Sequence, residues 1–154
     1  MSMCIRKANA ADARTLAEMA ALLFHHDDLQ ALQAEFEALT QHAEAACFLA
    51  ENGDAAVGFA QCQLRHDYVE GTETSPVGYL EGVYVKGPFR RRGVAGQLLR
   101  ACEAWAEQMG CTEFASDCEL NNMDSLSFHL CMGFEEANRI ICLTKRLRGG
   151  DSRA

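Results

Sequence analysis

The sequence predicts an α/β or α+β fold in which helices flank one mixed β-sheet. Stretches with the 3.6-residue period of an amphipathic helix alternate with short apolar runs that are typical of strands. Turns that contain glycine, asparagine or proline separate these stretches, and the predicted order is β, α, α, β, β, β, α, β, α, β. A chain of 154 residues fits one domain, which we expect to span residues 1–147.

The first third of the chain predicts a short strand and two helices. The strand is expected over residues 5–7, and Asn9 is placed to cap a helix with Asp12 in its first turn. Apolar residues then recur at helical spacing, at Leu16, Met19, Ala20, Leu23 and Phe24. After an interruption at residues 25–28, a second helix carries an apolar face at Leu29, Leu32, Phe36 and Leu39.

The apolar period changes after residue 45, which predicts the main part of the sheet. Three strands are expected, over residues 47–50, 56–64 and 77–85. The turn residues Asn52, Gly53 and Asp54 make the first two strands a hairpin. A polar loop over residues 66–76 precedes the third strand, which ends before Pro88.

The second half predicts two further helices and two further strands. An apolar stripe at helical spacing includes Val94, Leu98, Ala101, Cys102 and Trp105, and Gly110 is a suitable stop. A short strand over residues 113–117, a helix over 122–131 and a last strand over 140–147 follow. Residues 148–154 are expected to be a disordered tail outside the domain.

Composition excludes several classes of protein. The chain has 14 Lys and Arg against 22 Asp and Glu, a net charge of −8, which disfavours general nucleic-acid binding and favours a polycationic partner. It has no apolar run long enough to cross a membrane and no signal-peptide pattern at its start, so we expect no membrane association and a cytoplasmic location. The eight cysteines form no C-x-x-C pair, so no metal site is expected and most should be small buried residues.

The segment from residue 83 to residue 99 is the most informative part of the chain. A strand there leads through a basic loop into an amphipathic helix, and the free N–H groups at a helix start bind anions. Gly93 and Gly96 let a phosphate approach the backbone, and three consecutive arginines precede Gly93. The loop has neither the Walker pattern nor the dinucleotide fingerprint. An arginine-rich loop is also often a solvated turn, so loop chemistry alone leaves both interpretations open.

Two motifs follow one another in the second half of the chain, Arg90-x-x-Gly93-x-Ala95 and Asn122-x-x-Ser125-x-x-x-His129-x-x-x-Gly133-Phe134. In this order they are similar to those of the GNAT acyltransferase superfamily, and the resemblance covers about residues 3–147. The resemblance implies the GNAT acyltransferase fold and acetyl-CoA as cosubstrate. The residues that it places at acetyl-CoA are Val83, Tyr84, Val85, Arg90, Arg91, Arg92, Gly93, Val94, Ala95, Gly96 and Asn122.

Two other segments are distinctive, residues 68–85, with the run Gly-Thr-Glu-Thr-Ser-Pro, and residues 111–117. Both resemble a narrower group, the chromosomal, dimeric aminoglycoside 6'-N-acetyltransferases of Gram-negative bacteria. This resemblance implies transfer of acetyl from acetyl-CoA to the 6'-amine of an aminoglycoside by direct attack, and hence antibiotic resistance. It also implies a homodimer, in which residues 140–147 are a candidate for exchange between chains.

Glu81 and Asp117 are the main candidates on the acceptor side. Strand alternation places Glu81 on one face with Tyr79 and Val83, and a carboxylate among apolar neighbours is costly to bury unless it is used or paired. The resemblance implies that Glu81 contacts the aminoglycoside and is a candidate base. Asp117 ends a strand, where sites in open sheets tend to lie, and the resemblance makes it an aminoglycoside ligand and a catalytic candidate. A solvated strand-edge Glu and a turn Asp are the alternatives.

The other candidates rest mainly on the resemblance. His129 stands where many relatives have a tyrosine that is proposed to protonate the leaving thiolate, and a histidine hydrogen-bonded to backbone is the alternative. The expected substrate contacts are Phe24, Asp27, Tyr68, Glu136 and Asn138. Phe24 replaces a tryptophan of the relatives, and Asn138 replaces a glutamate for which Glu136 is a possible substitute.

Two alternative functions stay open from the sequence. A GNAT acetyltransferase with the same cosubstrate site can act on another cationic amine, such as a polyamine or a peptide N-terminus. A GNAT-like fold can also bind a cationic small molecule without turnover. The intact loop and Glu81 favour the enzyme.

Overall fold

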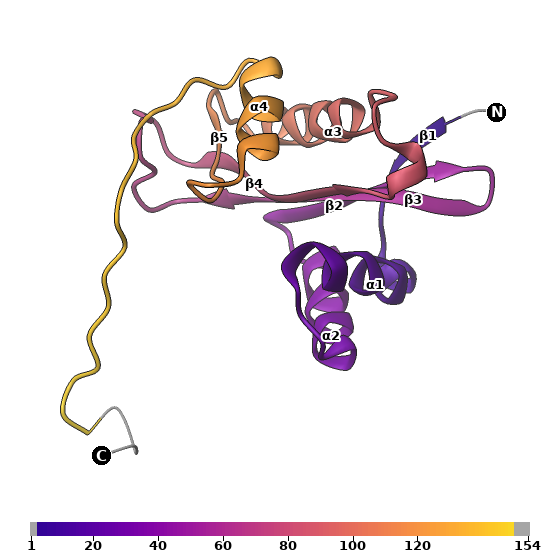
Figure 1. Ribbon diagram of the computed structural model, residues 1–154, viewed down its shortest axis with the longest axis horizontal. Helices are drawn as coiled ribbons and strands as arrows, with labels where there is room; N and C mark the ends of the chain where they lie inside the picture. The colour runs from indigo at the N-terminus through magenta and orange to yellow at the C-terminus, as the bar shows by residue number, and fades with distance from the viewer. Residues whose placement is uncertain (1–2, 150–154) are drawn as a thin grey trace.

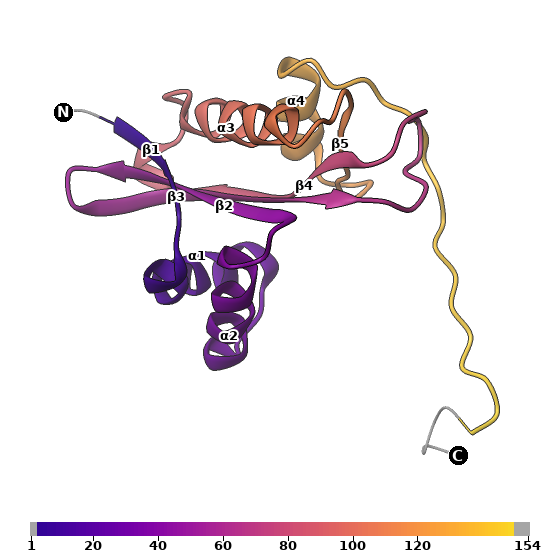
Figure 2. The same cartoon turned by 180° about the vertical axis from the view of Figure 1, so that it is seen from behind.

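The computed structural model describes residues 3–149 and contains one five-stranded sheet with helices on both faces (Figures 1 and 2). In chain order the elements are β1 (Met3–Lys7), the 3-10 turn η1 (Ala10–Asp12), α1 (Ala13–Phe24), α2 (Leu29–Thr40), β2 (Ala45–Asn52), β3 (Ala55–Arg65), β4 (Val77–Val85), the 3-10 turn η2 (Gly87–Phe89), α3 (Val94–Gln108), β5 (Phe114–Ser116) and α4 (Met123–Cys131). Helices α1 and α2 cover one face, and α3 and α4 cover the other. The predicted mixed fold is confirmed.

The strands lie in the order β1-β2-β3-β4-β5. The first four pair antiparallel, whereas β5 pairs parallel with β4 after the crossover through α3. The β4–β5 pairing joins only Gly78–Leu80 to Phe114–Ser116. Beyond Leu80, the side of β4 that faces away from β3 therefore has no strand neighbour among residues 3–149.

Each face of the sheet carries its own apolar core. On the α3 side, Leu98, Leu99 and Trp105 pack against Ala60 and Leu80. On the α1 and α2 side the core includes Leu16, Met19, Phe36, Leu49 and Phe59, and the rings of Phe36 and Phe59 meet edge to face at 6.0 Å. Burying one such aromatic or aliphatic side chain contributes about 1.5–3 kcal/mol, so these two layers hold the helices to the sheet.

The cysteines are divided between the core and the surface. Cys47, Cys62, Cys102 and Cys111 are buried, which is half of the eight rather than the expected majority. Burial raises the pKa of the Cys47 thiol to about 12, so this side chain behaves as a small apolar residue.

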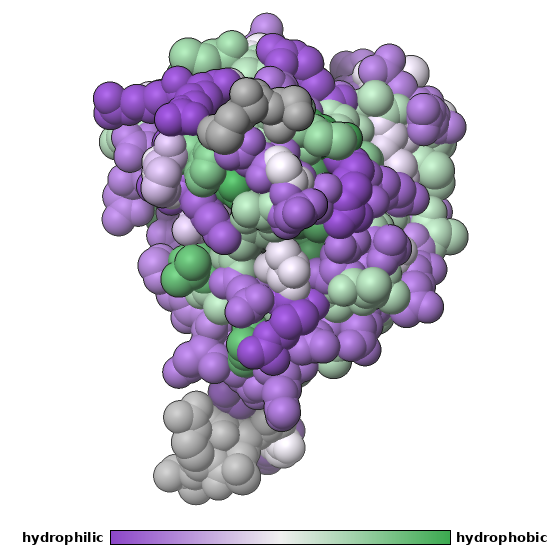
Figure 3. Space-filling view, turned by 90° about the vertical axis from the view of Figure 1, so that its right-hand side faces the viewer, coloured by the Kyte–Doolittle hydropathy of each residue, from purple (hydrophilic) through white to green (hydrophobic). Residues whose placement is uncertain are grey.

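Seen from the side of the β2–β3 hairpin, the surface is mostly hydrophilic with scattered apolar residues (Figure 3). Among residues 3–149, no helix is both long and apolar enough to span a membrane.

Capping side chains mark the starts of η1 and α2. Asn9 accepts a hydrogen bond from the Ala11 N–H at 2.9 Å, and Asp12 accepts one from the Asn9 N–H at 2.9 Å. The expected start at Asn9 is thus confirmed, although the first turn is the separate 3-10 turn η1. Asp28 caps α2 through Ala31, as side-chain acceptors at helix starts commonly do.

The strand expected over residues 140–147 is wrong for the single chain. These residues pair with no strand of residues 3–149, and they extend away from the body of the molecule (Figures 1 and 2). Ile141 and Leu143 are 85% and 86% exposed. Apolar spacing identified a segment suited to a strand, but a strand also needs a neighbour with free backbone groups. Of the expected tail, residues 150–154 lie outside the described residues.

Candidate active site

A groove opens at the junction between β4 and α3. Its volume is about 320 Å³. It is lined by Val85, Phe89, Arg90, Arg91, Gly93, Val94, Ala95, Gly96, Arg100, Phe128 and Met132. Two loop residues, Arg91 and Gly93, have left-handed backbones with φ of 64° and 77°. Glycine adopts this conformation at little cost, so Gly93 suits the tight entry into α3. The groove combines an α-helix start with three arginines and an apolar wall, which fits a phosphorylated ligand with an apolar arm.

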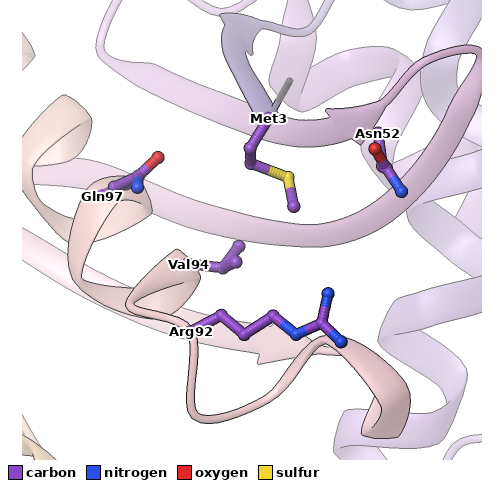
Figure 4. Close-up of a pocket in the computed structure, with 5 residues that line it drawn as sticks. All are labelled: Met3, Asn52, Arg92, Val94 and Gln97. Atoms are coloured by element: carbon purple, nitrogen blue, oxygen red, sulfur yellow. The ribbon is translucent and has the colours of Figure 1, made fainter. Parts of the chain in front are cut away.

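The three consecutive arginines have different surroundings. The Arg90 Nε donates a hydrogen bond to the Val85 carbonyl at 2.7 Å, so Arg90 fixes the end of β4. Arg91 lines the groove. Arg92 lies over the Phe89 ring at 5.7 Å and lines a second pocket of about 180 Å³ (Figure 4). In that pocket the side chains of Met3 and Val94 point toward each other, with Arg92 beside them.

The unpaired side of β4 borders this groove. Val83 and Val85 pack on the α3 face, while Tyr84 packs on the α1 and α2 face. Because β5 stops pairing at Leu80, backbone groups of β4 beyond this point have no strand partner on that side within residues 3–149. Asn122, the other residue expected at the cosubstrate, caps α4 by accepting a hydrogen bond from the Ser125 N–H at 3.1 Å.

A β-bulge places Glu81. Gln61 pairs with Gly82 and Cys62 pairs with Leu80, so Glu81 is the extra residue of β4. A bulge shifts the alternation of the strand, and Val83 consequently packs on the α3 face. The expectation that Glu81 and Val83 share a face is therefore wrong. Strict alternation predicted it, and the sequence carries no clear mark of the extra residue.

Glu81 is held by Arg65, the last residue of β3. The Arg65 Nη2 lies 3.0 Å from both carboxylate oxygens of Glu81, and the Nε lies 3.2 Å from one of them. The Arg65 guanidinium also stacks on the Tyr79 ring, 3.4 Å from its centroid. Arg65 was missed in the sequence analysis. The alternation of Gln61, Gln63 and Arg65 along β3 could have indicated a polar face.

Tyr79 connects this pair to Asp117. The Tyr79 hydroxyl donates a hydrogen bond to the Asp117 carboxylate. Burial raises the pKa of Tyr79, and the hydrogen bond to Asp117 raises it further, so the phenol stays protonated at neutral pH. Two of the predicted acceptor residues, Glu81 and Asp117, are thus brought together through Tyr79 and Arg65.

His129 has partners on both ring nitrogens. Its Nδ1 lies 2.7 Å from the Ser125 carbonyl and must donate to it, while its Nε2 lies 2.8 Å from the Ser116 Oγ. The ring is buried against Phe134, with centroids 5.0 Å apart. These contacts favour the alternative in which His129 joins α4 to the β4–β5 pair, as a histidine hydrogen-bonded to backbone.

The remaining candidates lie around the acceptor side. Phe24 packs against Gly82, the residue after Glu81, because a Cβ added at Gly82 would lie 2.8 Å from the Phe24 Cζ. Asp27 and Tyr68 are exposed in loops, and within residues 3–149 no hydrogen bond or ion pair joins either one to Glu81.

The segment after α4 lies against the polar loop before β4. The Asn138 amide donates to Glu70 at 2.5 Å, and Glu136 forms an ion pair with Arg139 at 2.8 Å. Asn138 is therefore held against the loop before β4, and within residues 3–149 no hydrogen bond joins Glu136 or Asn138 to Glu81 or Asp117. No group of three metal-ligating side chains occurs among residues 3–149.

Comparison with known proteins identifies one family of similar proteins. A sequence model of the acetyltransferase (GNAT) family matches residues 13–134. An aminoglycoside N(6')-acetyltransferase type 1 from Acinetobacter haemolyticus is 39% identical over 145 residues, which is 94% of this chain and 99% of that protein. Its counterpart from Stenotrophomonas maltophilia is 43% identical over 141 residues, covering 89% of each.

Solved structures are also similar to this chain. The aminoglycoside N-acetyltransferase AAC(6')-Iy in complex with CoA matches with a TM-score of 0.91 at 38% identity, covering 95% of this chain and 96% of that one. AAC(6')-Iy in complex with the bisubstrate analogue CoA-S-monomethyl-acetylneamine matches with a TM-score of 0.90 at 39% identity, covering 96% and 100%.

Proposed function

The chain belongs to the acetyltransferase (GNAT) family, and we propose that it transfers the acetyl group of acetyl-CoA to the 6'-amine of aminoglycosides. Acetylation turns an ammonium into a neutral amide, so the product loses one positive charge, and antibiotic resistance is the expected consequence. The reaction consumes acetyl-CoA, a metabolite of the cell interior, and a cytoplasmic location is part of the proposal.

One observation carries this proposal. The groove suited to a phosphorylated ligand and the Glu81 carboxylate suited to a cationic amine lie along a single strand, β4, with Val85 at the groove and Glu81 at the bulge. Asp117 is joined to the same strand through Tyr79. A thioester lying along the unpaired side of β4 would end near the carboxylates. The similar enzyme AAC(6')-Iy binds one molecule that joins CoA to an aminoglycoside fragment, which requires the same proximity of two sites.

The residues of the groove fit acetyl-CoA. The N–H groups at the start of α3 and the side chains of Arg91 and Arg100 suit its phosphates, since a helix start and guanidinium groups both bind anions. Val85, Phe128 and Met132 provide the apolar wall for its arm. Backbone groups of β4 beyond Leu80 can pair with the amides of that arm, as an added strand would.

On the acceptor side, Glu81 and Asp117 bind and orient the amine in this proposal. The amine must be neutral to attack, and the attack forms a C–N bond while the C–S bond of the thioester breaks. Glu81, or a water beside it, takes the proton whose loss turns the ammonium into the neutral amine, and the second N–H proton leaves to solvent as the amide forms. In this proposal the leaving thiolate takes its proton from solvent, since the Nδ1–H of His129 is donated to the Ser125 carbonyl and its Nε2 lies at the Ser116 hydroxyl. No acyl-enzyme is involved.

Acidic residues around the site favour a polycation over a simple amine. Besides Glu81 and Asp117, the loops before α2 and before β4 contain Asp27, Asp67, Glu70 and Glu73, and we expect these loops to border the acceptor side. Such a field concentrates and orients a ligand with several ammonium groups. Acetylation of a polyamine or of a peptide N-terminus uses the same cosubstrate groove and is the alternative within this class.

Mass spectrometry of the products tests the proposed function. Kanamycin carries an amine at its 6' position, and paromomycin carries a hydroxyl there. Incubation with acetyl-CoA is expected to add one acetyl group to kanamycin and none to paromomycin. Equal acetylation of both would contradict the 6' assignment, and acetylation of spermidine alone would move the acceptor to polyamines.

We also propose that the functional form is a homodimer. The segment after Asn138 exposes Ile140, Ile141, Leu143 and Leu147, and it has no strand neighbour within residues 3–149. A second copy of the chain would give this segment both a backbone partner and an apolar surface. Light scattering is expected to give twice the chain mass, and a stop codon in place of Ile140 should yield a monomer. A monomeric full-length chain would contradict the proposal.

A further inference from the structure

We propose that Arg65 is a positioning residue for the acceptor, which holds Glu81 and Tyr79 in the orientation that presents the two carboxylates to the amine. The inference rests on the proposed function and extends it to a residue that lies on β3, outside the motifs that identify the family.

The first support is the geometry of the Arg65–Glu81 pair. Three N···O contacts of 3.0–3.2 Å join the two side chains, so the guanidinium meets both carboxylate oxygens. The Glu81 side chain is 19% exposed and that of Arg65 is 39% exposed. A carboxylate that is largely withdrawn from water needs a partner, and a bidentate guanidinium fixes its plane as well as its charge.

The second support is the Tyr79 ring beneath the guanidinium. The Arg65 carbon Cζ lies 3.4 Å from the ring centroid, which is a stacking distance. Arg65 is therefore held from two directions, by a carboxylate edge and by an aromatic face. A guanidinium with both contacts can hold Glu81 and Tyr79 in fixed orientations, whereas a mobile surface ion pair would have the carboxylate contact only.

Arg65 also reaches Asp117 through the same ring. Stacking fixes the plane of Tyr79, and the plane sets the direction of the hydroxyl that donates to Asp117. The raised pKa of Tyr79 keeps that hydroxyl a donor at neutral pH. One arginine thus orients both proposed amine ligands, Glu81 by direct contact and Asp117 through Tyr79.

The Arg65–Glu81 ion pair leaves part of the carboxylate free to bind the substrate. An ionised carboxylate has about four lone-pair sites, and the guanidinium occupies those on one edge of Glu81. The other edge stays available for an ammonium or amine. Arg65 accordingly does not need to move when the acceptor binds, and the site is preorganised rather than induced.

Steady-state kinetics of Arg65→Lys tests this inference. Lysine keeps the charge but cannot make two parallel hydrogen bonds and stack on a ring. We expect KM for kanamycin to rise about tenfold, while KM for acetyl-CoA stays within twofold of wild type. Arg6→Lys is the matched control, since Arg6 also binds two carboxylates, Asp12 and Glu51, at the opposite end of the sheet. Its kanamycin KM should not change.

A second arm shows whether Arg65 acts through Glu81. In a Glu81→Gln background, Arg65→Lys should raise the kanamycin KM less than twofold, because coupled residues are not additive. An unchanged kanamycin KM in folded Arg65→Lys would overturn the inference. So would a lower KM in Arg65→Gln, which would mean that the arginine competes with the ammonium.

Calorimetric binding of kanamycin in the presence of CoA separates this inference from the proposed function. Wild-type protein that binds kanamycin without acetylating it would contradict the function but leave Arg65 testable by affinity, with a tenfold loss expected in Arg65→Lys. Wild-type protein that acetylates kanamycin while Arg65→Lys behaves identically would contradict only the inference. Absence of both binding and turnover would overturn both.

Discussion

The two carboxylates of the acceptor side differ in how the protein holds them. Glu81 is the extra residue of a β-bulge, and the Arg65 guanidinium binds both oxygens of its carboxylate. Asp117 follows β5 and accepts a hydrogen bond from a phenol. The charged partner makes Glu81 the more constrained of the two, so we expect it to orient the reacting amine and Asp117 to contribute mainly to binding.

Replacing Glu81 by Gln is expected to reduce kcat/KM for kanamycin by about 100-fold, at the lower end of what a general base contributes. The amide keeps a similar shape but loses the charge that binds and deprotonates the amine. The dissociation constant of acetyl-CoA should change little, because the groove lies further along β4. Glu107→Gln, an exposed residue of α3, makes the same change of charge as a control. Unaltered turnover in Glu81→Gln would remove Glu81 from the reaction.

Replacing Asp117 by Asn should chiefly raise KM for kanamycin, by about tenfold, with a smaller effect on kcat. The phenol of Tyr79 can still donate to the amide oxygen, so the local structure should persist. Asp54→Asn, in the turn between β2 and β3, is the matched control. A kanamycin KM equal to that of wild type would exclude Asp117 as a ligand.

At the scale of the elements, the helices and strands could largely be predicted because their signals are local. Asn9 caps the first turn, and the turn around Gly53 joins β2 to β3 as expected. The bulge at Glu81 and the pairing of Arg65 could not be predicted, since both depend on the register of β3 against β4. The missing strand after Asn138 has a similar cause, because pairing needs a neighbour that a single sequence does not specify.

The N-terminal elements offer a test of stability. Arg6 joins β1 to η1 and β2 by binding Asp12 at 2.8 Å and Glu51 at 2.8 Å. The hydrogen bonds from Arg6 lower the pKa of Asp12 in the folded protein. The ion pair therefore stabilises the fold fully above the pKa that Asp12 has in the unfolded chain, near 4. This stabilisation is lost as the pH falls through the lower pKa of Asp12 in the folded protein. Asp12→Asn should lower the free energy of unfolding by about 1 kcal/mol at pH 7, since solvent screens the 37% exposed Arg6.

Urea denaturation at several pH values measures this difference. The gap in unfolding free energy between wild type and Asp12→Asn should be constant from pH 7 to pH 5 and should narrow as the pH falls below about 4. A gap that widens toward acid would contradict the assignment of the ion pair.

At the scale of the whole molecule, the distribution of charge distinguishes the two proposed substrate sites. The net charge of −8 disfavours an anionic partner in general, yet the groove that we assign to acetyl-CoA concentrates arginines at one helix start. The acceptor side is acidic, so the protein separates opposite fields for its two substrates along β4. The identity of the acceptor could not be deduced from this charge pattern alone. It came from the similarity of residues 68–85 and 111–117 to known enzymes.

These opposite fields predict different responses to salt. Raising NaCl from about 20 mM to about 500 mM should lower kcat/KM for kanamycin roughly tenfold, because salt screens the attraction between the acidic loops and the ammonium groups. Sucrose at equal osmolality is the control and should have little effect. A salt-independent kcat/KM would show that the acidic loops do not attract the substrate.

The position of the acetyl group on the product tests the central claim most directly. Kanamycin has several amines, and two-dimensional NMR of the purified product identifies the one that has become an amide. The account predicts a single product, with the acetyl group on the 6'-amine. Acetylation of another amine, or a mixture of products, would contradict the proposed arrangement of β4, Glu81 and Asp117 around the reacting amine.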